Sequence, residues 1–413
     1  MTPCHGRCCG FEEESATWEP PRLAAKCDGE ARPGYDSMSA SEYLDVEETF
    51  QAKVRKLAQL LRQARRCVVY SGAGLSTSAG IGDYASQAQG SLSSAAPPAR
   101  SALLGEIVGR GGAASGEGPA SFRSPFCAQP TLSHRVLVGL HDAGLMHRWI
   151  NQNHDGLPQK AGLPQEAINE IHGAWHAPHN QVVPMGGSLR DDLFGDLLAC
   201  ERDADLVLAL GTSLCGMNAD RVVTSPAQRA ARGEAGQLGS VIVSLQQTVH
   251  DKEATLRIFA RCDDVFAALA RELGLRVPAE LAAGRFFTPA ILEGRSEELF
   301  VFEGLPYDAA GELSQDAKLT LDLREDAELV IPSGMHAGAT GVVDGFDREG
   351  NIKCRFKLKA KKGNLRAPVT LLLGRWWIQA AVDGSVQSLP VVNSPPEDSL
   401  CDRLRVLMRE YAS

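Results

Sequence analysis

The sequence of 413 residues lacks any long hydrophobic run. A helix that spans a membrane needs about 18 consecutive apolar residues, and even the run Val369–Leu373 is broken at once by Gly374 and Arg375. The N-terminus also lacks the charged and then apolar pattern of a secretory signal peptide. From these absences we expect no membrane partner and an intracellular protein, in the nucleus or the cytoplasm.

Positive charge and paired cysteines are scarce as well. The formal net charge is -9, which argues against broad coating of DNA by the whole chain but leaves room for a local basic face. Eleven cysteines are present, and their odd number and scatter are typical of free thiols and small buried side chains rather than of a disulfide framework. The hydrophobic content of 44% is that of an ordinary globular protein.

Composition divides the chain into four parts. Residues 1–42 mix cysteine, acidic residues, proline and glycine without an apolar period, which predicts a disordered leader. Residues 43–277 alternate apolar runs with helical periods, residues 278–394 are rich in short strands and turns, and residues 395–413 form a tail with a short helix. Within the second part, the stretch from 86 to 124 is a long Ser-, Ala-, Gly- and Pro-rich excursion, which is typical of a loop that covers a ligand or is disordered.

The second part has the pattern of an α/β protein. Short apolar runs predict buried strands at Cys67–Tyr70, Trp149–Ile150, Leu206–Leu210 and Ser240–Leu245. Apolar residues at helical spacing predict helices over Phe50–Leu61, Val136–Leu145 with Thr131 as the N-cap, Pro164–Ile171 and Asp263–Leu273. The alternation predicts a Rossmann-like, doubly wound parallel sheet.

Polar segments follow three of these strands. They are Gly72-Ala73-Gly74-Leu75-Ser76-Thr77, Asn151-Gln152-Asn153-His154-Asp155-Gly156 and Gly211-Thr212-Ser213-Leu214. Loops at the carboxyl ends of parallel strands form the ligand crevice of such sheets. The N–H groups of the first segment are suited to cradle a pyrophosphate, although its glycines can also serve only a tight turn. The third glycine of the dinucleotide fingerprint is replaced by Thr77.

Five segments in order resemble the motifs of the sirtuin (Sir2) family, over about residues 45–275. They are Gly72–Tyr84, Gln152–Leu157, Glu170-Ile171-His172-Gly173, Gly211–Leu214, and Val241–Thr248 with His250-Asp251. The segment Ala254–Ile258, with Lys53-Val54 and Leu57-Ala58, is similar to the class IV branch of the family.

The resemblance implies an NAD-dependent protein lysine deacylase, or deacetylase, which transfers the acyl group from a lysine to ADP-ribose and releases nicotinamide. It implies NAD as cofactor and an acylated, histone-like protein as substrate. The catalytic residues would be Asn153 and His172, the latter as general base on a ribose hydroxyl, for which an imidazole suits. Seen alone, such a histidine is commonly a structural residue. The implied cofactor-binding residues are Gly72, Ala73, Gly74, Ser76, Asp83, Tyr84, Gln152, Asp155, Gly211, Thr212, Ser213 and Ser244.

The chain also departs from the family. Gly80-Ile81-Gly82-Asp83-Tyr84-Ala85 stands where the family has Gly-Ile-Pro-Asp-Phe-Arg, and Ala85 cannot replace a guanidinium. Where the family holds zinc on two cysteine pairs, the interval from His172 to Asp205 has only Cys200, so we expect no zinc or other metal. We interpret His176 and His179 as surface residues. The segment Val182–Ser188 still resembles the place where sirtuins pair with the substrate backbone.

Two other functions remain open. The loss of the loop arginine and of the zinc ligands favours an NAD glycohydrolase or an ADP-ribosyl transferase on the same fold. A third reading is a non-catalytic NAD-binding scaffold that acts through its C-terminal part. The retained Asn153, Asp155 and His172 argue against the scaffold, since binding alone does not need them.

The third part predicts a small β-barrel module of SH3 or KOW type. Its candidate strands, separated by Gly-bearing turns, are Glu328–Ile331, Thr340–Val343, Ile352–Leu358, Val369–Leu373 and Trp376–Ala381. In Ile352–Leu358 apolar residues alternate with Lys353, Arg355 and Lys357, which predicts a basic face. Beside Trp376 and Trp377 this face is suited to nucleic acid or an acidic partner. The alternative is an ordinary edge strand that lysines keep from aggregating.

Overall fold

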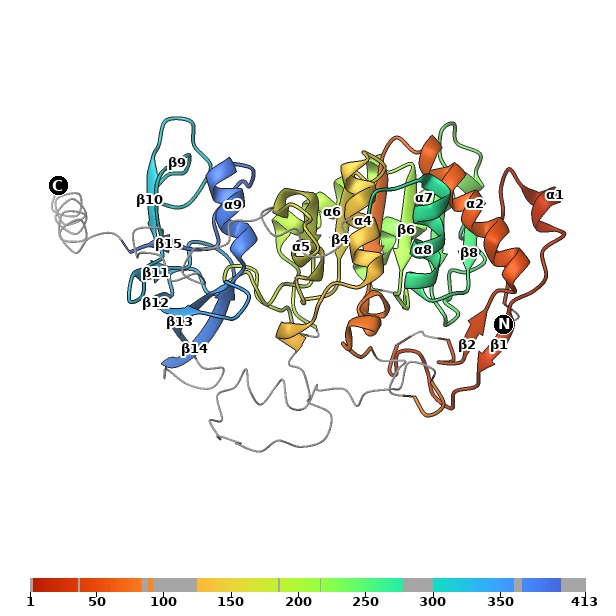
Figure 1. Cartoon of the computed structure of the whole chain (residues 1–413), viewed down its shortest axis with the longest axis horizontal. Helices are drawn as coiled ribbons and strands as arrows, with labels where there is room; N and C mark the ends of the chain where they lie inside the picture. The colour runs from red at the N-terminus through yellow and green to blue at the C-terminus, as the bar shows by residue number, and fades with distance from the viewer. Residues whose placement is uncertain are drawn as a thin grey trace, which may run out of the picture. The chain divides into compact units, whose positions relative to one another are not determined.

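The computed structural model describes residues 3–35, 38–83, 88–91, 125–184, 186–215, 217–277, 300–359 and 366–394. The chain divides into two compact units, drawn in Figure 1. The first contains Met1–Gly173 and Val182–Ala283, and the second contains Ala174–Gln181 and Gly284–Ser413. The second unit is therefore discontinuous in sequence. Among the described residues, no helix is both long and apolar enough to cross a membrane.

The first unit is built on a six-stranded sheet in which every pair of neighbours is parallel. The order is β5 (Ile168–Glu170), β4 (Arg148–Asn151), β3 (Cys67–Ser71), β6 (Leu206–Leu210), β7 (Gly239–Val243) and β8 (Leu256–Ile258). The three central strands β3, β6 and β7 are buried at every position. The order runs outward in both directions from β3, so the topological switch point lies between β3 and β6, where such sheets bind ligands. This confirms the predicted Rossmann-like sheet.

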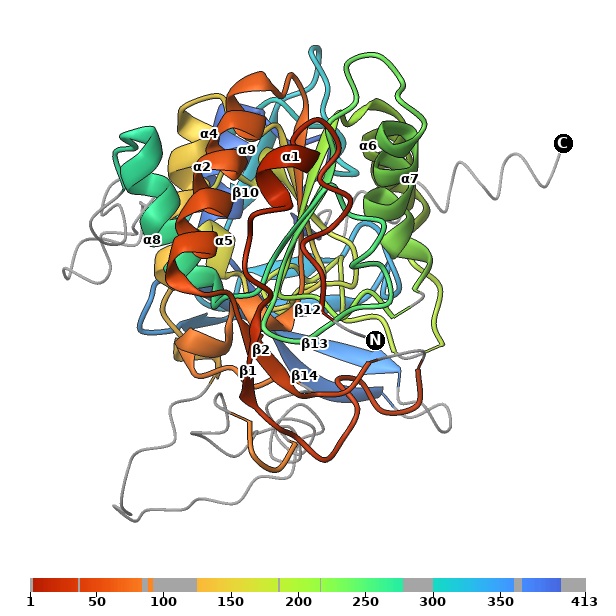
Figure 2. The same ribbon diagram turned by 90° about the vertical axis from the view of Figure 1, so that its right-hand side faces the viewer.

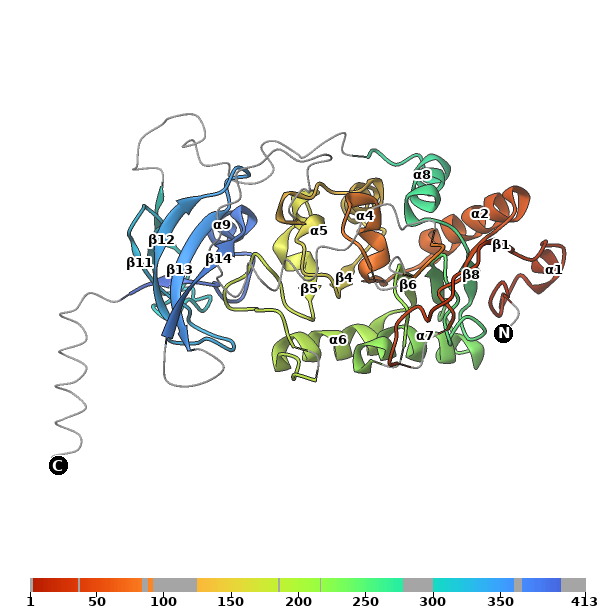
Figure 3. The same ribbon diagram turned by 90° about the horizontal axis from the view of Figure 1, so that it is seen from below.

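Helices cover both faces of this sheet (Figures 2 and 3). Helices α2 (Glu47–Gln63), α4 (Leu132–Asp142) and α8 (Cys262–Leu273) lie on one face, and α6 (Asp191–Asp203) and α7 (Arg221–Ala231) lie on the other. Each face has its own core of buried apolar side chains. Thr131 caps α4 as predicted, because its side chain accepts a hydrogen bond from the His134 N–H.

One predicted helix of this unit is wrong. Pro164–Ile171 forms a single 3-10 turn, η5 (Gln165–Ala167), followed by β5. Pro164 itself is extended, and pairing of Ile168 with Trp149 of β4 outweighs the helical spacing. Short elements at the ligand edge are η1 (Ala73–Leu75), η2 (Thr77–Ala79), η6 (Asn218–Asp220), η4 (Pro125–Cys127) and α5 (Leu157–Lys160).

The N-terminal segment has regular structure, so the disordered leader predicted for residues 1–42 is wrong for the described range 3–35. Helix α1 (Glu12–Ser15) is followed by β1 (Arg22–Ala25), which pairs antiparallel with β2 (Glu42–Leu44). The Cys8 N–H donates to Thr255 O at 2.9 Å, and His5 O accepts from the Arg257 N–H at 2.8 Å. Backbone pairing with the edge strand β8 explains the order, because it needs no apolar period.

The second unit contains antiparallel sheets. One has the order β14 (Arg366–Leu373), β13 (Ile352–Lys359), β12 (Thr340–Phe346), β11 (Glu328–Val330) and β15 (Val392–Asn393), and the other pairs β9 (Val301–Leu305) with β10 (Leu319–Asp322). The predicted β-rich module and four of its strands are confirmed. Within the described residues β14 and β15 each pair on one side only, so closure into a barrel stays a prediction.

The fifth predicted strand of the module, Trp376–Ala381, is wrong. These residues form helix α9 (Arg375–Asp383), whose apolar residues Trp376, Trp377, Ile378, Ala380 and Ala381 are buried. The run has no polar alternation, so its length and apolar content fit a buried helix as well as a strand. Both indole rings belong to the core of the unit.

His176 and His179, which we interpreted as surface residues, are buried in the second unit. Their rings pack against the tryptophans of α9, with centroids 5.2 Å apart for His176 and Trp376 and 5.1 Å apart for His179 and Trp377. The Gly374 N–H, just before α9, donates to His176 O at 2.9 Å. Ala174–Gln181 is therefore an integral part of this core, although about 200 positions separate it from α9 in the sequence.

The predicted alternation of β13 is confirmed, but its interpretation changes. Ile352, Cys354, Phe356 and Leu358 are buried, whereas Arg355 and Lys357 are exposed. The strand lies between β12 and β14, so the edge-strand alternative is wrong. The aromatic part of the predicted nucleic-acid site is also wrong, because Trp376 and Trp377 are buried and present no ring on which a base can stack.

Candidate functional site

The first three polar segments meet at the carboxyl ends of β3, β4 and β6. The Gly72 N–H donates to Leu210 O, and the Gly74 N–H donates to Gly211 O, both at 2.9 Å. The Gln152 Nε2 donates to Thr212 Oγ1, also at 2.9 Å. The site therefore forms at the switch point of the sheet, as the strand order requires.

The glycines of this edge are needed for contact between two loops. A Cβ on Gly72 would lie 2.8 Å from Gly211 O, and one on Gly74 would lie 2.8 Å from the Gly211 Cα. Gly211 has a φ of 57°, and its own Cβ would lie 2.5 Å from the carbonyl carbon of Gly74. Only glycine fits all three positions, because the obstructing atoms are backbone atoms that cannot move independently.

Most N–H groups of the first segment already have acceptors within the protein. The N–H groups of Gly72 and Gly74 donate to Leu210 O and Gly211 O, and those of Leu75 and Ser76 donate to Gly72 O and Ala73 O at 3.1 and 3.0 Å. These bonds shape the loop. The backbone cradle for a pyrophosphate stays a prediction.

A polar cluster joins the first and second segments. The Ser76 Oγ donates to Asp155 Oδ2 at 2.7 Å, and the Asn153 Nδ2 donates to Ser76 Oγ at 3.1 Å and to Gly72 O at 3.0 Å. Ser76 and Asp155 are buried, whereas Asn153 is half-buried. Ser76 and Asp155 therefore help to orient Asn153, and their predicted contact with the cofactor stays a prediction.

A second layer below this cluster was not apparent in the sequence. The Trp149 Nε1 donates to Ser71 Oγ at 2.7 Å, and the Ser71 Oγ donates to Asn151 Oδ1 at 2.8 Å. Asn151 Oδ1 also accepts from the Asn153 N–H at 3.1 Å. Ser71 and Asn151 are the last residues of buried strands, and a polar side chain at such a position is the signal that would have found them.

His172 lies two residues beyond β5, close to the second segment. Its imidazole Nε2 is shielded from solvent and has no hydrogen-bond partner among the described residues. Burial first, and then the charges of His154 and Arg32, lower the pKa of His172 from 6.5 to about 4 against a hydrogen bond with the Gln152 backbone that opposes the shift. The ring is therefore neutral at physiological pH and can accept a proton.

Arg32 is a functional candidate that we did not predict. It comes from the N-terminal segment, and its Nη1 lies 3.5 Å from the Cys215 Sγ, which in turn accepts from the Ser213 Oγ at 3.4 Å. A guanidinium thus reaches the loop after β6 from outside the five motifs. No local sequence pattern predicts this role for Arg32, because its contact with Cys215 depends on how the N-terminal segment folds.

A cavity of about 200 Å³ opens beside the glycine loops. It brings together four predicted residues, Gly74, Asp83, Gly211 and Ser244, with Thr77, Ser78, Leu245, Gln246, Ala260, Arg261 and Cys262. Pockets for drug-sized ligands measure about 300–1,000 Å³, so this cavity suits one half of a dinucleotide. Arg261 precedes α8 and belongs to none of the five motifs, whereas Gln246 belongs to the fifth, Val241–Thr248.

The remaining predicted residues lie outside this cavity. Asn153, Gln152 and His172 gather around the end of β4, and Thr212 is engaged by Gln152. Ala73 starts η1 and Ser213 contacts Cys215. Tyr84 and Ala85 lie outside the described residues. Among the residues that are described, no group of three His, Cys, Asp or Glu side chains is placed to hold a metal ion.

Glu170, at the end of β5, is a buried carboxyl group whose shifted pKa can be tested by experiment. It is 3% exposed, and burial raises the pKa of its carboxyl from 4.5 to about 7. Because its pKa is higher in the folded than in the unfolded state, the contribution of Glu170 to the free energy of unfolding is fully present below about pH 4.5. This contribution is lost as the pH rises to about 7. At about 1.4 kcal/mol per pKa unit, the loss amounts to about 3 kcal/mol.

We therefore expect Glu170→Gln, which cannot ionise, to gain about 3 kcal/mol in unfolding free energy relative to the unsubstituted protein between pH 4.5 and pH 8. Urea unfolding of both proteins across this range measures the difference. Glu272→Gln, at an exposed position in α8, is the control and should show a constant difference near zero. A Glu170→Gln difference that does not change with pH would contradict the assignment.

Comparison with known proteins identifies the class. Residues 72–181 match the model of the Sir2 family. NAD-dependent protein deacetylase sirtuin-7 of Mus musculus is 28% identical over 367 residues, covering 78% of this chain and 80% of that protein. The sirtuin-7 of Homo sapiens is 31% identical over 283 residues, covering 58% and 64%. NAD-dependent protein deacetylase SRT1 of Arabidopsis thaliana is 29% identical over 276 residues, covering 58% and 53%.

The chain therefore carries a Sir2-family domain and is a relative of the sirtuins. The predicted class IV-like placement fits its similarity to sirtuin-7. Among solved structures, one described as "Structural Basis for the Mechanism and Regulation of Sir2 Enzymes" has a TM-score of 0.42 and 18% identity, and covers 54% of this chain and 98% of that chain.

Proposed function

We propose that this protein is an NAD-dependent protein lysine deacylase of the sirtuin type, which transfers the acyl group from lysine to ADP-ribose and releases nicotinamide. The observation that carries the proposal is His172, whose neutral imidazole has an unpartnered Nε2 beside the end of β4. The relatives are named NAD-dependent protein deacetylases, which supports the same activity.

The described residues fit NAD at two places. Asp83 and Ser244 are among the residues that line the cavity, and a carboxylate and a hydroxyl are suited to hydrogen bonds with a ribose. Asn153 would hold the nicotinamide half, because its amide nitrogen already serves Gly72 O and Ser76 Oγ, which fixes the orientation of the amide oxygen. When bound, NAD supplies the nicotinamide leaving group and the ribose that receives the acyl group.

His172 would act as a general base through Nε2. A base must be unprotonated when substrate binds, and a pKa of about 4 keeps this imidazole in that form throughout the neutral range. The His172 carbonyl accepts from the Val183 N–H at 2.9 Å, so the residue is tied to the segment that follows. Because Val182 is 38% exposed, we include in the proposal that Val182 and Val183 pair with the backbone of the acylated substrate as an added strand.

A histone-like substrate and an intracellular location, in the nucleus or the cytoplasm, belong to the same proposal. The second candidate function is an NAD glycohydrolase or ADP-ribosyl transferase, and Ala85 in place of the family arginine favours it. Both candidates share the fold and NAD, so only the acceptor of the ribosyl or acyl group separates them.

One assay distinguishes these functions. Purified full-length protein is incubated with NAD, with and without an acetyl-lysine peptide, and free nicotinamide and peptide mass are followed. Release of nicotinamide only with peptide, together with loss of the acetyl group, is the expected result. Release without peptide would support the hydrolase, and a peptide that gains ADP-ribose would support the transferase. No release, with NAD bound, would leave only the scaffold.

A further inference from the structure

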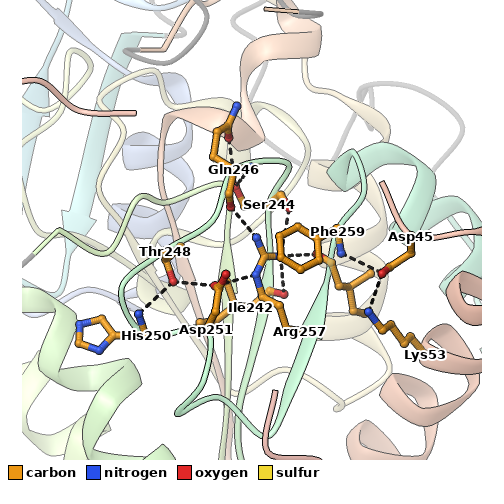
Figure 4. Close-up of polar contacts among 11 residues, drawn as sticks. Asp45, Lys53, Ile242, Ser244, Gln246, Thr248, His250, Asp251, Arg257 and Phe259 are labelled. Atoms are coloured by element: carbon orange, nitrogen blue, oxygen red, sulfur yellow. Dashed lines mark hydrogen bonds and ion pairs between the residues drawn. The ribbon is translucent and has the colours of Figure 1, made fainter. Parts of the chain in front are cut away.

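Arg257, in the edge strand β8, has a completely buried side chain, and each of its three guanidinium nitrogens donates a hydrogen bond (Figure 4). Its Nε donates to Asp251 Oδ1 at 2.7 Å, its Nη1 donates to Ser244 O at 3.0 Å, and its Nη2 donates to Gln246 O at 2.5 Å. The guanidinium carbon lies 3.7 Å from the centroid of the Phe259 ring. A buried guanidinium is costly unless it is paired and hydrogen-bonded, and this one has the Asp251 carboxylate and the backbone carbonyl groups as partners.

The partners of Arg257 belong to the wall of the cavity. Ser244, Leu245 and Gln246 all line it, and their three successive carbonyl groups all accept hydrogen bonds from the protein. Arg257 serves the first and the third, and the Tyr43 N–H donates to Leu245 O at 2.9 Å. The segment leaves β7 and forms no regular structure of its own, so these bonds determine its path.

Glu42 fixes the side chain of Gln246 and, through it, that of Ser244. Glu42 is buried, and its Oε1 accepts from the Gln246 Nε2 at 3.3 Å. The Ser244 Oγ in turn donates to Gln246 Oε1 at 3.2 Å. A continuous set of hydrogen bonds thus runs from Glu42 through Gln246 to the hydroxyl of Ser244, a residue that lines the cavity.

Neighbouring charged groups hold the guanidinium in place. Asp251 Oδ1 accepts from the Thr248 Oγ1 at 2.8 Å as well as from Arg257. On the far side of the Phe259 ring, Asp45 accepts from the Phe259 N–H at 2.9 Å and forms a buried ion pair with Lys53 at 2.6 Å. Burial lowers the pKa of Lys53 to about 8, although Asp45 opposes this.

We propose that Arg257 is a positioning residue for NAD, which fixes Ser244–Gln246 in the shape that receives one nucleoside half of the dinucleotide. The inference rests on the proposed NAD-dependent function. A lysine cannot replace Arg257, because one ammonium group cannot reach a carboxylate and two divergent carbonyl groups in a plane. Without the guanidinium group, the carbonyl groups of Ser244 and Gln246 lose their buried hydrogen-bond donors, and this wall of the cavity must rearrange.

The test compares Arg257→Lys with Leu269→Ala, a control in α8. Leu269 is buried at 0% exposure in the apolar core and does not line the cavity, so its truncation lowers stability without touching the wall. Calorimetry gives the Kd for NAD, and steady-state kinetics gives the KM values for NAD and for an acetyl-lysine peptide. We expect Arg257→Lys to raise the Kd and KM for NAD by about 10- to 100-fold while the KM for peptide changes by less than about twofold.

Leu269→Ala should lower the melting temperature and leave both KM values unchanged. If Arg257→Lys does not fold, Glu42→Ala removes the buried acceptor of the Gln246 amide in the same wall and should weaken NAD binding in the same selective way. Equal effects of Arg257→Lys on both KM values, or NAD binding as tight as in the unsubstituted protein, would overturn the inference and leave the proposed function intact. Absence of NAD binding by the unsubstituted protein would overturn both.

Discussion

The His172→Ala variant is expected to lose deacylation by about 10²- to 10⁴-fold while its Kd for NAD changes by less than about threefold. The reason is that the Nε2 atom has no hydrogen-bond partner among the described residues, so the substitution removes a proton acceptor together with one hydrogen bond to the Gln152 backbone. Nicotinamide release with an acetyl-lysine peptide measures the loss, and calorimetry measures binding. His147→Ala is the matched control, because His147 is exposed and precedes β4 at the opposite edge of the sheet.

The pH profile of the unsubstituted protein tests the same residue independently. Burial holds the pKa of His172 at about 4, so the base form is present above that value and is lost only as the pH falls through it. The acidic limb of kcat/KM that depends on His172 should therefore lie near pH 4 rather than near 6.5, the ordinary value. A limb near 6.5, or a His172→Ala variant with full activity, would contradict the assignment.

The second large effect is expected for Gly211→Ala, which should abolish NAD binding and destabilise the first unit by more than about 3 kcal/mol. The added methyl carbon would lie 2.5 Å from backbone atoms of both Gly74 and Leu75, and the residue has a φ of 57°. The loops that contain Gly74 and Gly211 must then separate, because neither atom belongs to a flexible side chain. Calorimetry with NAD and thermal unfolding measure the two losses.

The control variant Gly236→Ala distinguishes the effect of backbone strain from that of a steric clash. Gly236 also has a positive φ, 77°, but a Cβ there would meet nothing within 4 Å. Its substitution should cost only about 1–2 kcal/mol of backbone strain and leave NAD binding unchanged. If Gly211→Ala binds NAD as tightly as Gly236→Ala does, the interlock of the two loops is not what shapes the site.

The sequence predicts the sheet because local and global signals agree there. The runs at β3, β6 and β7 are apolar at almost every position, and burial on both faces is what a central parallel strand experiences. For this reason the sequence correctly predicts that the polar segments after these strands lie together at the carboxyl edge of the sheet. Where a run is short, as at Ile168–Glu170, strand pairing decides the structure and periodicity does not reveal it.

Other features depend on partners distant in the sequence. His176 and His179 are buried because α9 supplies indole rings from near residue 376. The N-terminal segment is ordered because it pairs with β8 and the adjoining backbone. In the site, Ser76 and Asp155 have the residue types of ligand contacts, yet they satisfy each other in the interior. A single sequence does not show which polar groups satisfy one another and which remain for a ligand.

The most direct test of the central claim is the mass of the nucleotide product formed from NAD and an acetyl-lysine peptide. If Asn153, His172 and the cavity beside the glycine loops serve one NAD molecule, the product should be ADP-ribose that carries the acetyl group, formed in equal amount with nicotinamide and deacetylated peptide. Formation of ADP-ribose without the acetyl group, with the peptide still acetylated, would contradict the account.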